Sequence, residues 1–123
     1  MELSALLGTW INSNPDTSSV AVVKATDLDG KLRLQVSAVG AGGFVDWGLA
    51  EANVFAAAPD SQLGAGFTCR YDFDFGETRL QGMIMKGLLV LAQFHLFNDS
   101  ERESYFLREY FAATHDRFAK VNS

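Results

Sequence analysis

The sequence has little cysteine and no clustered positive charge. Its one cysteine, Cys69, excludes an intrachain disulfide and any metal site built from several cysteines. Lys and Arg number 10 against 15 Asp and Glu, which gives a formal net charge of -5, and the basic residues are scattered. We therefore expect neither a nucleic acid nor a membrane surface as partner, because binding to phosphates needs a cationic patch.

Long apolar runs are also missing. The longest strongly apolar stretch, from Gly87 to Phe97, is too short to cross a bilayer as a helix. The opening residues, MELSALLGTW, have neither the basic segment nor the long apolar core of a secretory signal. These two features predict a cytoplasmic location.

Motifs for cofactors and metals do not occur. The sequence has no G-x-G-x-x-G, P-loop or G-x-S-x-G pattern, and its two histidines lack metal-site spacing. We expect no metal and no cofactor.

What the chain does have is apolar residues broken by frequent turn signals. A length of 123 residues with 48% hydrophobic residues predicts one folded domain, residues 1–123. Turn residues such as NSNPDTSS and GAGG separate eight runs of strand length. These runs are Gly8–Asn12, Val20–Ala25, Leu32–Val39, Gly48–Phe55, Phe67–Phe75, Arg79–Met85, Leu88–Phe97 and Ser104–Ala112. Their short connections predict an all-β fold, an eight-stranded antiparallel up-and-down barrel whose closure removes the sheet edges.

Two of the runs carry the most information. In FTCRYDFDF, strict alternation puts Phe67, Tyr71 and Phe73 on one face with Cys69 and Phe75. The opposite face, with Arg70 and Asp72, is typical of a salt-bridged outer surface, and the alternative is a charged pair inside the barrel.

The run from Leu88 to Phe97 is apolar on both faces. A barrel strand of this kind needs a cover for its outside, which predicts a homo-oligomer, a dimer or a tetramer. Phe94 and His95 lie on opposite faces, so if Phe94 faces the pocket, His95 faces the partner subunit. His95 is then a structural histidine, and its alternative role is that of a catalytic base.

Three patches resemble a known family. Gly8-Thr9-Trp10 resembles the start of the calycins, in which such a tryptophan plugs one end of the barrel. GTWIN, SAVG (residues 37–40) and HDRFAKV (residues 115–121) are similar, in this order, to segments of the avidin and streptavidin family.

The resemblance implies a set of ligand-binding residues. Asn12, Ser37 and Asp116 would hold the polar end of a ligand, and Phe67 and Phe94 would stand where the avidins use tryptophan. Leu80 departs from the family, which has an aromatic residue there in its sixth strand, so tight biotin binding is not implied.

Together these features predict noncovalent binding of a small, largely apolar molecule in the barrel, with Tyr71 and Phe73 adding to the wall. An alternative is a cyclase or isomerase that uses the same cavity, with His95 or Glu109 as proton carrier. In a third interpretation, phenylalanine side chains fill the barrel, and the chain serves as an interaction module.

Overall fold

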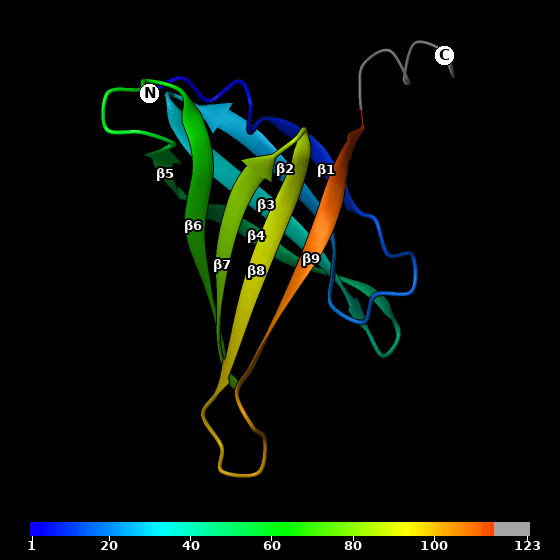
Figure 1. Ribbon diagram of the computed structural model, residues 1–123. Helices are drawn as coiled ribbons and strands as arrows, with labels where there is room; N and C mark the ends of the chain where they lie inside the picture. The colour runs from blue at the N-terminus through cyan, green and yellow to red at the C-terminus, as the bar shows by residue number, and fades with distance from the viewer. Residues whose placement is uncertain (115–123) are drawn as a thin grey trace.

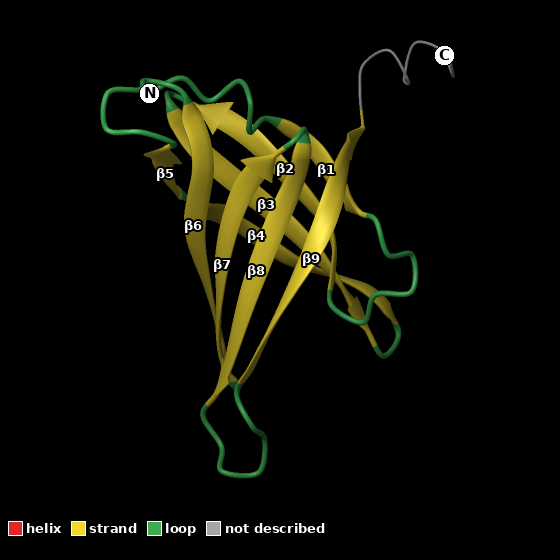
Figure 2. Ribbon diagram, viewed as in Figure 1, coloured by secondary structure: helices red, strands yellow, loops and turns green. Residues whose placement is uncertain are grey.

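The computed structural model describes residues 1–114, and His115 and Asp116 lie outside this range. Within this range, nine strands form one antiparallel sheet that curls into a half-barrel (Figure 1). They are β1 (Gly8–Asn12), β2 (Val20–Leu28), β3 (Lys31–Gly40), β4 (Gly43–Glu51), β5 (Asn53–Ala56), β6 (Gly64–Phe73), β7 (Gly76–Met85), β8 (Leu88–Phe97) and β9 (Tyr105–Thr114). The connections between them are turns and loops (Figure 2), and no helix of the described residues is long and apolar enough to cross a membrane.

The order of the strands in the sheet is β4-β3-β2-β1-β9-β8-β7-β6-β5. All strands that follow one another in the chain are paired except β4 and β5, and β9 returns to pair with β1. The all-β, antiparallel, up-and-down architecture predicted from the sequence is thus confirmed.

The strand count differs from the prediction at one place. The predicted run Gly48–Phe55 is divided at Ala52, and the part before it pairs with β3 while the part after it pairs with β6. One nearly continuous stretch of chain therefore supplies both edges of the sheet, and β4 also lies in contact with β6.

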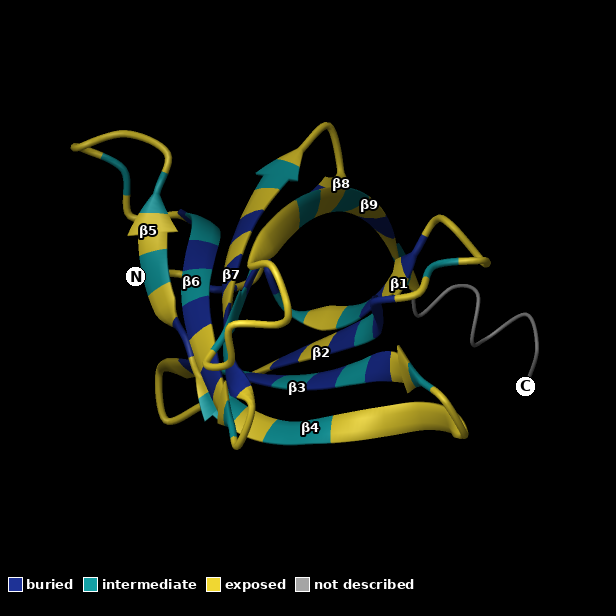
Figure 3. Ribbon diagram, turned by 90° about the horizontal axis from the view of Figure 1, so that it is seen from below, coloured by how far each residue is buried: buried dark blue, intermediate teal, exposed yellow. Residues whose placement is uncertain are grey.

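Alternation sets which side chains face the interior of the curled sheet. Buried and exposed residues alternate along the strands (Figure 3), and the core contains Leu34 of β3, Phe67 of β6 and Leu91 of β8. The face predicted for FTCRYDFDF is confirmed, because Phe67, Cys69 and Tyr71 are buried, whereas Arg70 and Asp72 form an exposed ion pair. The salt-bridged outer surface is therefore the interpretation that holds.

The N-terminal segment covers one end of the half-barrel, which we call the closed end. Its Glu2 donates a backbone hydrogen bond to the Gln62 carbonyl and accepts one from the N–H of Gly64, the first residue of β6. Leu3 and Leu6 are buried in the core. Trp10 is only 5% exposed, and its indole N–H donates to the Leu6 carbonyl over 2.9 Å. The Trp10 ring is thus buried and its one polar group is hydrogen-bonded, so this end of the half-barrel is part of the core.

A bulge in β4 shapes the opposite end. The register with β3 passes from Val36–Gly48 to Ser37–Asp46, so Trp47 is an extra residue in β4. Gly48 has a φ of 86°, a left-handed conformation that favours glycine, and its N–H donates to the Asp46 carboxylate over 2.8 Å. The bulge leaves the Trp47 ring packed on Tyr71 and Phe73.

Candidate functional site at the open end

A pocket of about 640 Å³ occupies the end of the half-barrel where β6 and β8 finish and β7 and β9 begin, which we call the open end. Its lining comes from segments far apart in sequence, including the loop before β2, the β3–β4 hairpin and the loop between β8 and β9. A hollow of similar size, about 600 Å³, lies beside the N-terminal segment, but its lining holds no ionisable side chain. The open end is therefore the better candidate for a functional site.

Five aromatic side chains, which we call the aromatic rim, surround this pocket. They form a line of ring contacts, because the Trp47 and Phe73 centroids are 5.2 Å apart and those of Phe73 and Phe75 also 5.2 Å. The line continues from Phe75 to Phe97 and from Phe97 to Tyr105, each at 6.1 Å. Such a wall offers large, rigid apolar area to a guest molecule.

A charged loop lies across part of the rim. Arg102, between β8 and β9, places its guanidinium 4.5 Å from the ring centroid of Phe97 and 5.3 Å from that of Phe75. Its charge is also paired with Asp99 at 2.7 Å. The guanidinium is thus held by a cation–π contact and an ion pair at the edge of the pocket.

A small polar cluster, the polar floor, lies at the inner side of the rim. Ser19, Thr78 and His95 line the pocket and are each less than 10% exposed. His95 Nδ1 is 3.0 Å from the Thr78 hydroxyl, and its Nε2 is 3.4 Å from Gln93 Oε1. Because Gln93 Oε1 can only accept, Nε2 carries the ring proton, and the Thr78 hydroxyl donates to Nδ1.

Burial makes His95 a neutral group. The loss of solvation lowers the pKa of His95 below its ordinary value of 6.5. Its ring also stacks on Tyr105 with centroids 4.7 Å apart. Since both ring nitrogens are engaged and the ring is stacked, this histidine is held as a fixed, uncharged part of the polar floor.

Tyr71 closes the wall between β6 and the strands opposite. Its hydroxyl lies 2.9 Å from the carbonyl oxygen of Gly48 and 3.1 Å from that of Leu34. Burial raises the pKa of Tyr71 far above its ordinary value, so the hydroxyl stays a donor at physiological pH. This contact joins β6 to β3 and β4 where no strand ladder does so.

Two of the residues predicted to bind a ligand lie beside each other at this site. Phe73 is part of the aromatic rim, and Tyr71 stands behind it with ring centroids 6.4 Å apart. Phe67 shares their face of β6 but is buried deeper, against Gly82, where a Cβ would overlap its ring. Phe67 therefore belongs to the packed core of the half-barrel and does not line the pocket at the open end.

The predicted polar residues have other positions. Asn12 is buried, and its side chain donates to the Val20 carbonyl and accepts from the Asn14 N–H, which fixes the turn after β1. Ser37 is on the outward face of β3, opposite to Leu34 and Val36, which are buried. The structure therefore does not bring these two side chains to the pocket, and Asp116 lies outside the described residues.

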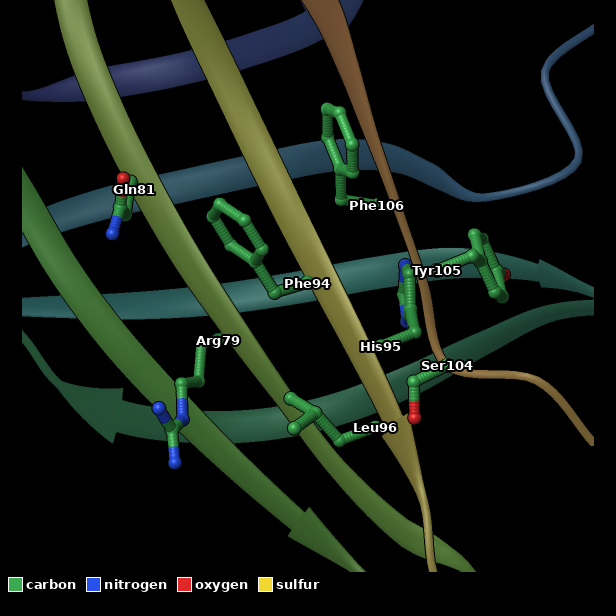
Figure 4. Close-up of a pocket in the computed structure, with 8 residues that line it drawn as sticks. All are labelled: Arg79, Gln81, Phe94, His95, Leu96, Ser104, Tyr105 and Phe106. Atoms are coloured by element: carbon green, nitrogen blue, oxygen red, sulfur yellow. The ribbon is translucent and has the colours of Figure 1, made fainter. Parts of the chain in front are cut away.

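The orientation of β8 is the reverse of the one considered from the sequence. His95 is buried on the inner face, while Phe94 faces outward and stacks on Phe106 of β9, with centroids 5.9 Å apart. Figure 4 shows these two phenylalanines side by side and His95 beside Tyr105. Both pairs line a second hollow of about 400 Å³, which shares His95 and Tyr105 with the pocket at the open end.

The candidate proton carriers are not brought together. Glu109 accepts a hydrogen bond from the Thr17 hydroxyl over 2.9 Å and pairs with Leu91, four residues from His95 on β8. That spacing corresponds to about 13 Å along a strand. Among the described residues, no group of three metal-ligating side chains lies close enough to hold a metal ion.

Several residues of the site were not selected from the sequence. Phe97 and Tyr105 flank a loop, where alternation gives no guidance. Thr78 lies among the polar residues at the start of β7, and Gln93 lies in the apolar strand β8. A usable signal was the polar pair Gln93 and His95 at spacing two on one face of β8. Two polar groups on the same face of a strand predict a shared buried cluster or a shared outer surface, and only packing distinguishes the two.

Comparisons with known proteins give no relative whose functional residues could be compared with this site. No protein-family model, no curated protein and no solved structure matches this chain.

Proposed function

We propose that this chain binds a small, largely apolar molecule at the open end of the half-barrel. The apolar body of the guest lies between the side chains of the aromatic rim, and a polar group at its inner end meets the polar floor. The observation that carries the proposal is the pairing of five rings with one buried polar cluster around a pocket of about 640 Å³. Apolar cavities with a few placed polar groups are typical of small-molecule sites.

The finer architecture belongs to the same proposal. β4 and β5 are separated by Ala52 alone and pair with β3 and β6, so counting them as one bent strand gives eight strands in a ring. A ring of eight strands with Trp10 buried at one end agrees with a calycin-like barrel. A biotin-like guest and a cytoplasmic location stay predictions within this proposal.

The enzyme alternative has less support. A general base needs a ring nitrogen that is free to reach the substrate, and both nitrogens of His95 face other side chains. Glu109 is bonded to Thr17 and lies about four residues further along the sheet. Ligand binding without catalysis therefore explains the arrangement of the polar floor better than an enzyme does.

Thermal unfolding in the presence of candidate guests tests the proposal. A panel of lipophilic metabolites together with biotin is added, and a guest at a hundred times its Kd stabilises the fold by about 2.7 kcal/mol. Phe97→Ala should weaken the binding of any hit about tenfold or more, because it removes one ring of the wall.

Phe94→Ala is the matched control for this experiment. It changes the same residue type on the same strand but on the outward face, and the affinity should stay within about twofold. If no member of the panel stabilises the protein, or if the two variants weaken a hit equally, the site is not at the open end.

We propose in addition that two copies of the chain associate through the outer face of β7, β8 and β9. Met83, Val90 and Tyr110 lie in one cross-strand row on this face, and Phe94 and Phe106 lie in another. Phe106 is 71% exposed and Met83 and Tyr110 are about half exposed, and exposed large apolar side chains that gather on one face favour an interface. A second copy presents the same surface, which suits a two-fold interface.

Light scattering across a range of concentrations tests the association. Phe106→Ser should shift the protein to monomer, whereas Phe55→Ser, an exposed phenylalanine at the sheet edge, should not. A wild-type protein that is monomeric at every concentration would contradict this part of the proposal.

A further inference from the structure

Gln93 carries a polar group that the protein itself leaves unpaired. Its side chain is fully buried, and its Oε1 accepts from the Ser19 hydroxyl over 2.6 Å and lies near His95 Nε2. Its Nε2 has no hydrogen-bond partner among the described residues. A buried amide N–H without an acceptor is costly, so such groups in folded proteins are paired with a partner, with water or with a ligand.

The position of Gln93 connects this unpaired group to the pocket. Ser19 and His95, which hold its Oε1, both line the pocket, so Gln93 lies one layer behind the polar floor. The hydrogens of Ser19, Thr78 and His95 are already directed to acceptors within the cluster. Within this cluster, the donor that is left without an acceptor is therefore the Gln93 amide.

Resting on the function proposed above, we infer that the pocket selects guests with a terminal hydrogen-bond acceptor, such as a ketone, aldehyde or amide carbonyl, and that Gln93 Nε2 is the donor that recognises it. A guest that ends in a bare hydrocarbon leaves the amide unpaired and gains less free energy on binding.

Two probes with one shared body test this selectivity. 2-Acetylnaphthalene and 2-ethylnaphthalene have the same ring system and nearly the same shape, and they differ in a carbonyl oxygen against a methylene group. In titration calorimetry, the Kd of the acetyl compound should be about tenfold lower than that of the ethyl compound. This is the factor expected for one buried hydrogen bond.

Variants assign the preference to Gln93. Gln93→Leu should reduce the ratio of the two constants to about one by weakening the acetyl compound. Gln81→Leu is the matched control, because Gln81 is on the exposed face of the neighbouring strand β7, and it should keep the ratio.

A measurement on the wild-type protein covers the case in which Gln93→Leu does not fold. The side-chain amide signals of Gln93 in a ¹⁵N–¹H NMR spectrum should shift on addition of 2-acetylnaphthalene and shift much less with 2-ethylnaphthalene. Amide signals that stay in place at saturation would mean that only a bound water satisfies Gln93, and they would overturn the inference.

The outcomes separate this inference from the function on which it rests. Binding of both probes with equal affinity supports the pocket and overturns the carbonyl selectivity. A preference that survives in Gln93→Leu overturns the assignment to Gln93. Failure of both probes to bind counts against the proposed function and removes this inference with it.

Discussion

The two ends of the half-barrel are built from the same strands and differ in what covers them. At the closed end, Leu3, Leu6 and Trp10 are buried, and the one polar atom of the tryptophan ring is paired within the chain. At the open end, Phe75 and Tyr105 stay about half exposed, and a polar cluster lies beneath them. The comparison teaches that the covering segment, and not the strand pattern, decides which end is packed as core and which end keeps a pocket.

Replacing the two tryptophans gives the largest expected contrast. Trp10→Ala should lower the free energy of unfolding by about 3–5 kcal/mol, since it opens a cavity in a compact part of the core. Trp47→Ala removes a half-buried ring at the open end and should cost roughly 1–2 kcal/mol. Urea unfolding measures both, and equal losses would abolish the distinction between the ends.

Acid should act on the open end through His95. Its pKa is lowered in the folded state, so the unfolded chain takes up a proton more readily, and stability is present at neutral pH and decreases as the pH falls below about 6.5. For one proton the slope is at most about 1.4 kcal/mol per pH unit.

Unfolding free energies at several pH values between about 7 and 5 check this effect. His95→Gln should remove that part of the slope, while the carboxylates and His115 contribute equally to both proteins. If the unfolding free energies of the wild type and the variant depend on pH in the same way, the protonation of His95 does not contribute to stability.

The Tyr71 hydroxyl provides the smallest and most local test. Tyr71→Phe keeps the ring but removes the contact with the carbonyl oxygens of Gly48 and Leu34, and it should cost about 1 kcal/mol. Tyr110→Phe, at an exposed position on the outer face of β9, should change stability very little. Equal effects in urea unfolding would mean that the hydroxyl contributes nothing to joining β6 and β4.

Much of the fold could be predicted from alternation and turn residues. The run FTCRYDFDF specifies its buried face because polar and apolar residues alternate strictly, and the short connections favour antiparallel pairing. The division at Ala52 was not predictable, because the stretch from Gly48 to Phe55 has no glycine or proline at the point where its pairing partner changes.

The site was harder to predict than the fold. β8 is apolar on both faces, so the alternation of side chains alone did not show that Gln93 and His95 point inward. The cost of burying polar groups favoured the orientation in which they point outward. That cost is offset by hydrogen bonds from outside β8. Ser19, in the loop before β2, bonds to Gln93, and Thr78, in β7, bonds to His95. Such long-range pairing becomes visible only once the sheet has curled.

The contact between β4 and β6 has a consequence for the motions of the molecule. These strands are joined by the Tyr71 hydroxyl, by the Cys69 thiol on the Glu51 carbonyl and by ring packing, whereas β7 and β8 share a full ladder of backbone hydrogen bonds. We therefore expect local opening of the half-barrel to begin between β4 and β6. Backbone amides of β4 should then exchange their hydrogens with solvent earlier than those at the centre of β8.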